Sequence, residues 1–334
     1  MQKTALIIGI TGQDGGILAD ILRHKGYCVH GIRPYSATPD THNLDPKLDI
    51  QLHYGDLTDA GNIRRLIEHI QPNEIYNLGA MSHVGESFNT PLATANINAL
   101  GTLRILEALR DLQSAQDIRL YQASSSELFG NAPAPQNEQT PFAPCSPYAT
   151  AKLFAYWSVR NYRDSYGIFA SNGILFNHES AQRGDHFVTQ KIVNAIANIK
   201  KGHQECLHLG NLDSKRDWGH ARDYMMAAHA ILNHGQADDF VIASGQAHTV
   251  REFATRAFVM AGYELEWRYQ HEKEQAIDIK TGAILVRVDP ALYRPNEVNC
   301  LRGDATKARQ ELGWEPTMSL DNLIEEMLNA AIAR

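Results

Sequence analysis

The chain has 334 residues, of which 43% are apolar and 21% are charged, with a formal net charge of -7 at pH 7. This length suits one large domain or two closely joined ones, and the acidic balance argues against a nucleic-acid or membrane-surface role. Apolar runs are shorter than a membrane span, a strand starts too early to leave room for a signal peptide, and four cysteines are scattered, so we expect a cytoplasmic protein without a metal site.

The first half of the chain alternates short apolar runs with helical patterns, which is typical of a parallel sheet covered by helices. The run Ala5-Leu6-Ile7-Ile8 shows no polar alternation, which favours a central strand buried on both faces. We expect strands at 5–10, 28–33, 50–54, 74–78, 118–123 and 169–176, and helices at 14–25, 60–70, 92–112 and 148–166. This order predicts an α/β fold of the Rossmann type, a doubly wound parallel sheet.

Beyond Asn177 the alternation becomes irregular. We expect helices at 188–201, 223–232, 250–261 and 320–331, and a β-hairpin over 277–286 that turns at 280–282. A further apolar run at 240–243 is predicted to return to the first sheet. The chain therefore divides into an NADP-binding Rossmann domain at 1–176, with a later strand near 239–244, and a smaller C-terminal α/β substrate domain made mostly of 177–334.

A glycine-rich loop separates the first expected strand from its helix, with Gly9, Gly12 and Gly15 three residues apart. Glycines there allow a tight turn and let backbone amides approach a pyrophosphate at the helix N-terminus. A structural turn is the alternative reading of the glycines alone, but the position between strand and helix favours nucleotide binding. The loop also contributes Thr11, Gln13 and Asp14 to the expected site.

The end of the second strand decides the expected cofactor. A site for NAD carries an acid about twenty residues after the glycine loop, whereas Arg33 stands here and suits the 2′-phosphate of NADP. A solvated surface arginine is the alternative interpretation of Arg33. Asp56 follows the third strand and is a candidate acceptor for the adenine amino group. The remaining expected cofactor contacts are Leu57, Leu78, Gly79, Ala80, Ser82 and Tyr121.

A candidate catalytic group follows the strand expected at 118–123. Tyr148 and Lys152 lie four residues apart and share one face of a helix, where the ammonium, with a nicotinamide ring, is expected to lower the pKa of the phenol. Ser125 is the middle of three serines that end a strand, where parallel sheets assemble their sites. Glu127 alone is more simply a capping or solvated acid, but beside Tyr148 it is a candidate carbon-acid base, which points to an elimination.

Longer segments resemble the GDP-mannose 4,6-dehydratase family, within the extended short-chain dehydrogenase/reductase superfamily. The segments that carry the similarity are 9–15, 76–84, 121–124, 172–180, 216–220 and 294–298, in order along nearly the whole chain. The resemblance implies an NADP-dependent hydro-lyase that converts GDP-D-mannose to GDP-4-dehydro-6-deoxy-D-mannose and water.

The resemblance also implies roles for the catalytic group. Tyr148 takes the proton of the sugar O4 while C4 gives a hydride to NADP, and Glu127 removes the proton on C5. The 6-hydroxyl leaves as water with help from Ser125 or Tyr148, and the hydride returns to C6. The cofactor ends the cycle unchanged, so it is expected to remain bound.

By the same resemblance, other residues are assigned to ligands, and the protein is expected to be a homo-oligomer, dimer or tetramer. Lys152, His178 and Arg183 are assigned to the cofactor. The residues assigned to the GDP-sugar are Ser82, Glu127, Asn177, Lys191, Arg216, Arg294 and Glu297. Each of the charged ones is otherwise a surface ion-pair residue.

The chain departs from the family pattern at several positions. Ser125 stands where threonine is usual, residues 33–36 lack the usual paired arginines, and arginines are common at Cys145, Gln182 and Gln190. These departures bear on the oligomer and the sugar. Three other readings therefore stay open: the same reaction on GDP-manno-heptose, an NADP-dependent GDP-sugar epimerase or ketoreductase, and a silent NADP-sensing or scaffold protein.

Overall fold

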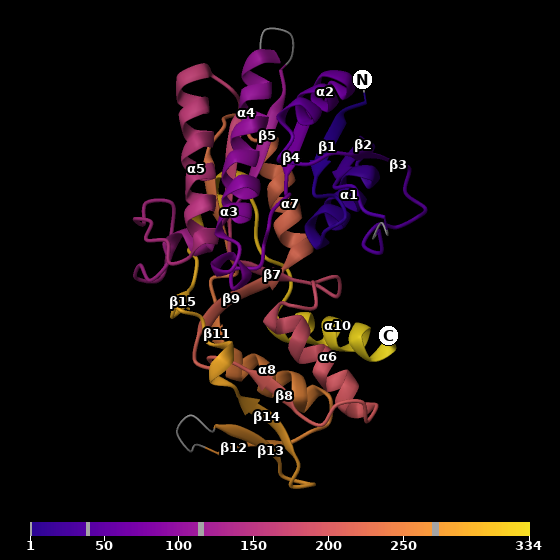
Figure 1. The fold of residues 1–334 in the computed structure, drawn as a ribbon, viewed down its shortest axis with the longest axis vertical. Coiled ribbons are helices and arrows are strands. Elements are labelled where there is room, and N and C mark those ends of the chain that lie inside the picture. Colours follow the sequence, from indigo (N-terminus) through magenta and orange to yellow (C-terminus); the bar gives the residue numbers. More distant parts are fainter. Residues whose placement is uncertain (1, 38–40, 113–116, 269–273) are drawn as a thin grey trace.

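The computed structural model describes residues 2–37, 41–112, 117–268 and 274–334. Figure 1 shows two lobes stacked along the long axis of the molecule, with β7 and β9 near their junction. The larger lobe is built on a seven-stranded sheet with the order β10-β6-β5-β4-β1-β2-β3, and every pairing in it is parallel. The predicted Rossmann-type fold is therefore confirmed.

The strands of this sheet match the six strands expected up to residue 176 and the later run expected at 240–243. They are β1 (Thr4–Ile8), β2 (Cys28–Arg33), β3 (Ile50–Tyr54), β4 (Glu74–Asn77), β5 (Arg119–Ser125), β6 (Ala170–Leu175) and β10 (Asp239–Ile242). Side chains of β1 alternate between two cores: Ala5 and Ile7 face one, and Leu6 and Ile8 face the other. All four are buried, so β1 is a central strand covered on both faces.

Helices cover both faces of the sheet. The helices α1 (Gln13–His24) and α7 (Ala221–Leu232) share the core on one face, and α2 (Ala60–Ile70), α4 (Gly101–Leu112) and α5 (Pro147–Tyr166) share the core on the other. The single helix expected at 92–112 is instead α3 (Pro91–Thr94), a π-helical segment (Ala95–Leu100) and α4. Asn98 in the π-helical segment brackets Met81, accepting from its N–H at 2.9 Å and donating to its carbonyl at 3.0 Å. The irregular turn thus ties this helix to the loop after β4.

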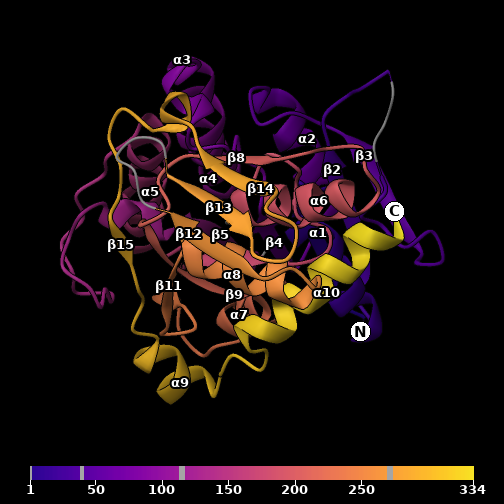
Figure 2. The same ribbon diagram turned by 90° about the horizontal axis from the view of Figure 1, so that it is seen from below.

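The second lobe has its own core between helices and a small sheet. The helices are α6 (Val188–Lys200), α8 (Val250–Met260) and α10 (Leu320–Ala333), and Figure 2 shows α8 and α10 beside this sheet. The sheet order is β12 (Leu265–Arg268), β13 (Gln275–Asp278), β14 (Ile284–Val288) and β8 (Leu207–Leu209). β13 and β14 pair antiparallel, which confirms the predicted hairpin.

Short elements that the sequence did not predict join the lobes. A third sheet contains β7 (Asn177–Glu179), β9 (Lys215–His220), β11 (Ala247–Thr249) and β15 (Cys300–Leu301). The helix α9 (Thr306–Leu312) lies against β10. Residues after 177 therefore supply α7, α9 and β10 to the larger lobe. Within the described ranges, no helix combines the length and apolar composition required to cross a bilayer.

Candidate active site

The glycine loop between β1 and α1 approaches the end of β4 closely. Gly9 has φ +82°, and a Cβ atom there would lie 2.8 Å from the backbone nitrogen of Gly79. Only glycine satisfies both the left-handed backbone and this contact. The helix α1 begins after Gly12, and no side chain caps its N-terminus. The loop therefore leaves the first amides of α1 available to an anion.

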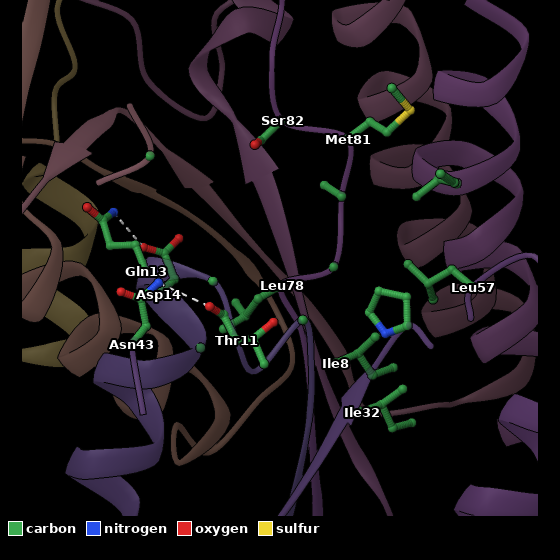
Figure 3. A pocket seen from close by; sticks show the side chains of 18 of the residues that line it. Ile8, Thr11, Gln13, Asp14, Ile32, Asn43, Leu57, Leu78, Met81 and Ser82 are labelled. Carbon is green, nitrogen blue, oxygen red and sulfur yellow. Dashed lines mark hydrogen bonds between the residues drawn. The ribbon is translucent and has the colours of Figure 1, made fainter. Parts of the chain in front are cut away.

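A cavity of about 450 Å³ extends from this loop along the carboxyl ends of β1, β2 and β4. In Figure 3, polar side chains of Thr11, Gln13 and Asp14 lie at one end. Apolar side chains of Ile8, Ile32 and Leu57 lie at the other end. The residues assigned to the cofactor that line it are Gly9, Thr11, Gly12, Gln13, Asp14, Gly15, Asp56, Leu57, Leu78, Gly79, Ala80, Ser82 and Arg183. This division suits a ligand with a charged middle and a flat apolar end.

An ion pair closes the polar end of the cavity. Nε2 of His178 lies 2.9 Å from Oδ2 of Asp14, and Nδ1 lies 2.7 Å from the carbonyl oxygen of Phe176. Both ring nitrogens face acceptors, which requires a proton on each. Burial opposes both charges, but the pair outweighs it: the pKa of His178 is raised, and the pKa of Asp14 is lowered to about 2. The acid of the loop is therefore neutralised inside the protein.

Four residues assigned to the cofactor lie elsewhere than the lining of this cavity. The guanidinium of Arg33 stacks on Tyr54, 4.7 Å from its ring centroid, and its Nη2 donates to the Tyr54 hydroxyl at 3.2 Å. Tyr121 is fully buried in β5. Lys152 and His178 are not lining residues, and each is hydrogen-bonded to a backbone carbonyl oxygen. Arg33 is still next to a lining residue, Pro34.

The structure adds lining residues that sequence reasoning missed. Those from the segment between β2 and β3 are Pro34, His42 and Asn43, and those from the segment before α6 are Gln182, Gly184, His186 and Phe187. Asn43 donates to the carbonyl oxygen of Thr11 at 3.0 Å and so holds the glycine loop from outside. These segments contain no repeat or motif, so only the tertiary fold reveals them. The nearby Arg183 was the one sequence feature that pointed to the segment before α6.

The catalytic candidates meet where β5 ends. Ser125 is the last residue of β5, and the backbone N–H of Glu127 donates to its hydroxyl at 3.2 Å. The N-terminus of α5 lies alongside: Ser146 caps it, and the N–H of Tyr148 donates to the hydroxyl of Ser87 at 3.2 Å. Tyr148, Ser125 and Glu127 are all buried. Strand end and helix start thus converge as the parallel sheet requires.

Burial dominates the electrostatics at Tyr148 in the free protein. It raises the pKa of Tyr148 to about 12, and the negative charge of Glu127 adds to the shift while a hydrogen bond with Ser125 opposes it. The ammonium of Lys152 lies 6.0 Å from the Tyr148 ring centroid. The expected lowering of the pKa involves this ammonium together with a nicotinamide ring, and it stays a prediction. Burial also lowers the pKa of Lys152 to about 8, against the attraction of Asp14.

A buried polar network holds Lys152. Its Nζ donates to the carbonyl oxygen of Ala123 at 2.8 Å, and Nε2 of Gln122 donates to the same oxygen at 2.9 Å. The amide oxygen of Gln122 in turn accepts from Asn77 at 2.7 Å and from Thr102 at 3.1 Å. Every member is nearly inaccessible to solvent. Because buried polar groups are costly to leave unpaired, this network fixes the position of the ammonium.

Of the residues assigned to the sugar nucleotide, four form a charged chain. Nη1 of Arg294 lies 4.0 Å from Oε1 of Glu127 and 3.8 Å from Oε1 of Glu297. Nη2 of Arg216 lies 3.1 Å from the same Glu297 oxygen. The other three lie on different segments: Ser82 in the cavity wall, Asn177 on β7 and Lys191 on α6. The chain of charges leads directly from the catalytic group into the second lobe.

Within the described ranges, no group of three or more His, Cys, Asp or Glu side chains is arranged to hold a metal ion. The four cysteines are unpaired thiols.

Three comparisons with known proteins agree. Residues 6–327 match the family model described as GDP-mannose 4,6 dehydratase. The chain is 52% identical to the GDP-mannose 4,6-dehydratase of Sinorhizobium fredii over 98% of this chain and 96% of that protein. It is 48% identical to the GDP-mannose 4,6 dehydratase of Homo sapiens over 99% and 92%. The UDP-glucose 4-epimerase structure from Thermus thermophilus shares the fold, with a TM-score of 0.82, 22% identity and 98% of each chain covered. The chain therefore belongs to the GDP-mannose 4,6-dehydratase family.

Proposed function

We propose that this protein converts GDP-D-mannose to GDP-4-dehydro-6-deoxy-D-mannose and water, with NADP as its resident cofactor. The observation that carries the proposal is the meeting of Tyr148, Ser125 and Glu127 at the end of β5. A phenol and a carboxylate at one site supply the two separate proton abstractions that dehydration requires. Family membership supports the same reaction.

The cavity at the glycine loop fits a dinucleotide. The uncapped start of α1 suits a pyrophosphate, and the end formed by Ile8, Ile32 and Leu57 suits a flat adenine ring. Arg33, at the end of β2, is assigned to the 2′-phosphate, which favours NADP over NAD. When bound, NADP would accept the hydride from C4 and return it to C6. Arg183 lines the cavity and is assigned to the cofactor as well. The other residues assigned to the cofactor, which do not line the cavity, are Lys152, His178 and Tyr121.

Tyr148 is assigned as the base for the sugar O4. Its pKa of about 12 leaves the phenol protonated in the free protein, so Tyr148 can act as a base only after it has lost this proton to solvent. The ammonium of Lys152 and the hydrogen bond with Ser125 favour the phenolate. The phenolate then takes the proton of O4 as the hydride leaves C4.

Glu127 is assigned as the base for the proton on C5. A ketone at C4 acidifies that hydrogen, and a buried carboxylate close to the phenol can reach the adjacent carbon. Nη1 of Arg294 lies 4.0 Å from Oε1 of Glu127, so a positive charge faces this carboxylate. The 6-hydroxyl then departs as water with a proton from Ser125 or Tyr148, and the C5 proton is replaced from solvent.

The charged chain in the second lobe is assigned to the GDP part. Arg216 and Arg294 can each bind phosphate oxygens in a bidentate way, while Glu297 holds both arginines in place. Asn177, Lys191 and Ser82 complete this proposed site. We accordingly assign cofactor binding to the larger lobe (1–176 with β10) and GDP-sugar binding mostly to residues 177–334.

We also propose that the protein is a homo-oligomer. The helices α4 and α5 carry a hollow lined by Leu103, Leu153, Phe154 and Trp157, and Phe154 and Trp157 are 45% and 52% exposed. An exposed apolar face of this kind supports a protein partner. Sedimentation of the wild type and of Trp157→Glu tests this: the substitution is expected to lower the mass of the particle, and an unchanged monomer in both would contradict it.

The experiment that tests the function is product mass spectrometry on a panel of GDP-sugars. With NADP present, GDP-mannose is expected to yield a product lighter by one water. If only GDP-manno-heptose were dehydrated, the sugar assignment would be wrong while the chemistry stood. A product of unchanged mass but altered stereochemistry would instead indicate an epimerase, and no product from any sugar would indicate a silent binding protein.

A further inference from the structure

Both backbone polar groups of Ala181 are hydrogen-bonded to side chains of α10 and of Arg334, the residue that follows it. Its N–H donates to Oε1 of Glu326 at 3.3 Å, and its carbonyl oxygen accepts from Nη2 of Arg334 at 2.6 Å. Ala181 directly precedes Gln182 and Arg183, which line the cofactor cavity. The helix α10 otherwise belongs to the core of the second lobe. A helix of the second lobe therefore holds a segment that lines the cofactor cavity of the larger lobe.

The second oxygen of Glu326 is fixed by His220. Nε2 of His220 lies 3.1 Å from Oε2 of Glu326, while its Nδ1 accepts the N–H of Arg222 at 3.1 Å as the cap of α7. With Nδ1 as an acceptor, Nε2 carries the proton and donates to Glu326. This hydrogen bond lowers the pKa of Glu326 although burial opposes it. Glu326 is thus an ionised acceptor with one donor at each oxygen.

Side-chain hydrogen bonds connect the segment around Ala181 to the glycine loop. The hydroxyl of Ser180 accepts the N–H of Gln182 at 3.1 Å and donates to Oε1 of Gln13 at 2.9 Å. Gln13 opens α1 and donates to Asp14 at 3.0 Å and to the carbonyl oxygen of His178 at 3.2 Å. Side-chain contacts therefore run unbroken from α10, through 180–182, to the first turn of α1.

We propose that Glu326 is a positioning residue that holds segment 181–187 against the dinucleotide, so that α10 controls how tightly the protein retains its cofactor. The inference rests on the proposed binding of NADP in the cavity. An ordinary surface ion pair would contribute little to any function. Glu326 differs because it anchors a backbone N–H next to lining residues and because its own donors fix both of its oxygens.

Paired variants on α10 test this proposal. Glu326→Gln and Glu325→Gln remove the same charge from adjacent positions, and Glu325 is exposed. NADP affinity is measured by titration calorimetry on the full-length protein stripped of nucleotide, and kcat is measured at saturating NADP. Glutamine has one acceptor oxygen, so it can accept from only one of the two donors that Glu326 binds, and its NH2 group faces the other donor. We therefore expect Glu326→Gln to weaken NADP binding about tenfold, with kcat within about twofold of the wild type. Glu325→Gln is expected to bind like the wild type.

Equal affinity of the two variants, whether normal or equally weakened, would overturn the proposal. If Glu326→Gln does not fold, Arg334→Ala removes the other anchor of Ala181 and is expected to weaken NADP binding likewise; normal binding by that variant would also overturn the proposal. A wild-type protein that bound no NADP would instead overturn the proposed function, and this inference with it.

Discussion

The ammonium of Lys152 donates a hydrogen bond of 2.8 Å to the carbonyl oxygen of Ala123. This contact joins α5, whose first turn contains Tyr148, to β5, whose last residue is Ser125. The positive charge is therefore fixed relative to both the phenol and the strand end. Because Lys152 is buried, its pKa falls to about 8, so its positive charge is lost as pH rises through about 8.

The first prediction concerns this charge. In the wild type, kcat/KM is expected to fall above about pH 8, since kcat/KM reports groups of the free enzyme and neutral Lys152 no longer stabilises the phenolate. Lys152→Arg keeps the positive charge at every accessible pH. The kcat/KM of this variant is expected to be lower than that of the wild type but to stay level above about pH 8. The check is a pair of pH profiles. An unchanged fall in the arginine variant would assign the alkaline limb to another group.

The second prediction separates the two bases. Glu127→Gln is expected to bind NADP normally and to lose product formation by a factor of about 10²–10⁴, because the amide cannot take the C5 proton. In heavy water the wild type should place deuterium at C5, and the variant should not. Glu138→Gln is the matched control: Glu138 is also largely buried, and it accepts from Val241 N at 2.7 Å, which an amide oxygen can still do. Normal turnover by Glu127→Gln would remove Glu127 from the mechanism.

The third prediction uses two glycines with the same backbone. Gly9 and Gly26 have φ +82° and +83°, but a Cβ at Gly26 meets nothing within 4 Å, whereas at Gly9 it would lie 2.8 Å from Gly79 N. Gly26→Ala should cost about 1–2 kcal/mol of unfolding free energy from the backbone alone. Gly9→Ala should cost more and should also lose NADP binding. Denaturant unfolding and NADP titration of both variants provide the test, and equal behaviour would show that the contact with Gly79 is unimportant.

The fourth prediction follows from Asp14 and His178. The pKa of His178 is raised in the folded state, so its stabilisation is complete below pH 6.5 and is lost as pH rises through the folded pKa. The pKa of Asp14 is lowered to about 2, so its stabilisation is complete above pH 3.8 and is lost only as pH falls toward 2. As pH rises above 6.5 and through the raised pKa of His178, the wild type should therefore lose stability that His178→Gln does not lose. Urea unfolding at several pH values measures this, and parallel slopes would contradict it.

Periodicity and apolar runs were sufficient to predict the main sheet of the larger lobe. Its central strand β1 is buried on both faces and is a continuous apolar run, and the glycine spacing located the loop after it. The third sheet could not be predicted in this way. Its strands are two to six residues long, and β9 pairs with β15, which lies about eighty residues later. Such short strands carry no period of their own.

The sequence indicated which residues belong to the site better than it indicated the contacts between them. Tyr148, Ser125 and Glu127 were expected together, and the structure places them at one strand end. The upward pKa shift of Tyr148 in the free protein comes from its burial, which only the folded chain reveals. The stacking of Arg33 on Tyr54 and the lining segment at 182–187 depend on neighbours brought close by the fold alone.

The most direct test of the account follows one hydrogen atom. GDP-mannose carrying deuterium at C4 is incubated with the purified protein and NADP in ordinary water, and the product is analysed by mass spectrometry and NMR. We expect a product lighter by one water that carries the deuterium at C6, since the hydride taken from C4 returns to the same sugar. A product that keeps its 6-hydroxyl, or one that has lost the deuterium, would contradict the dehydratase mechanism.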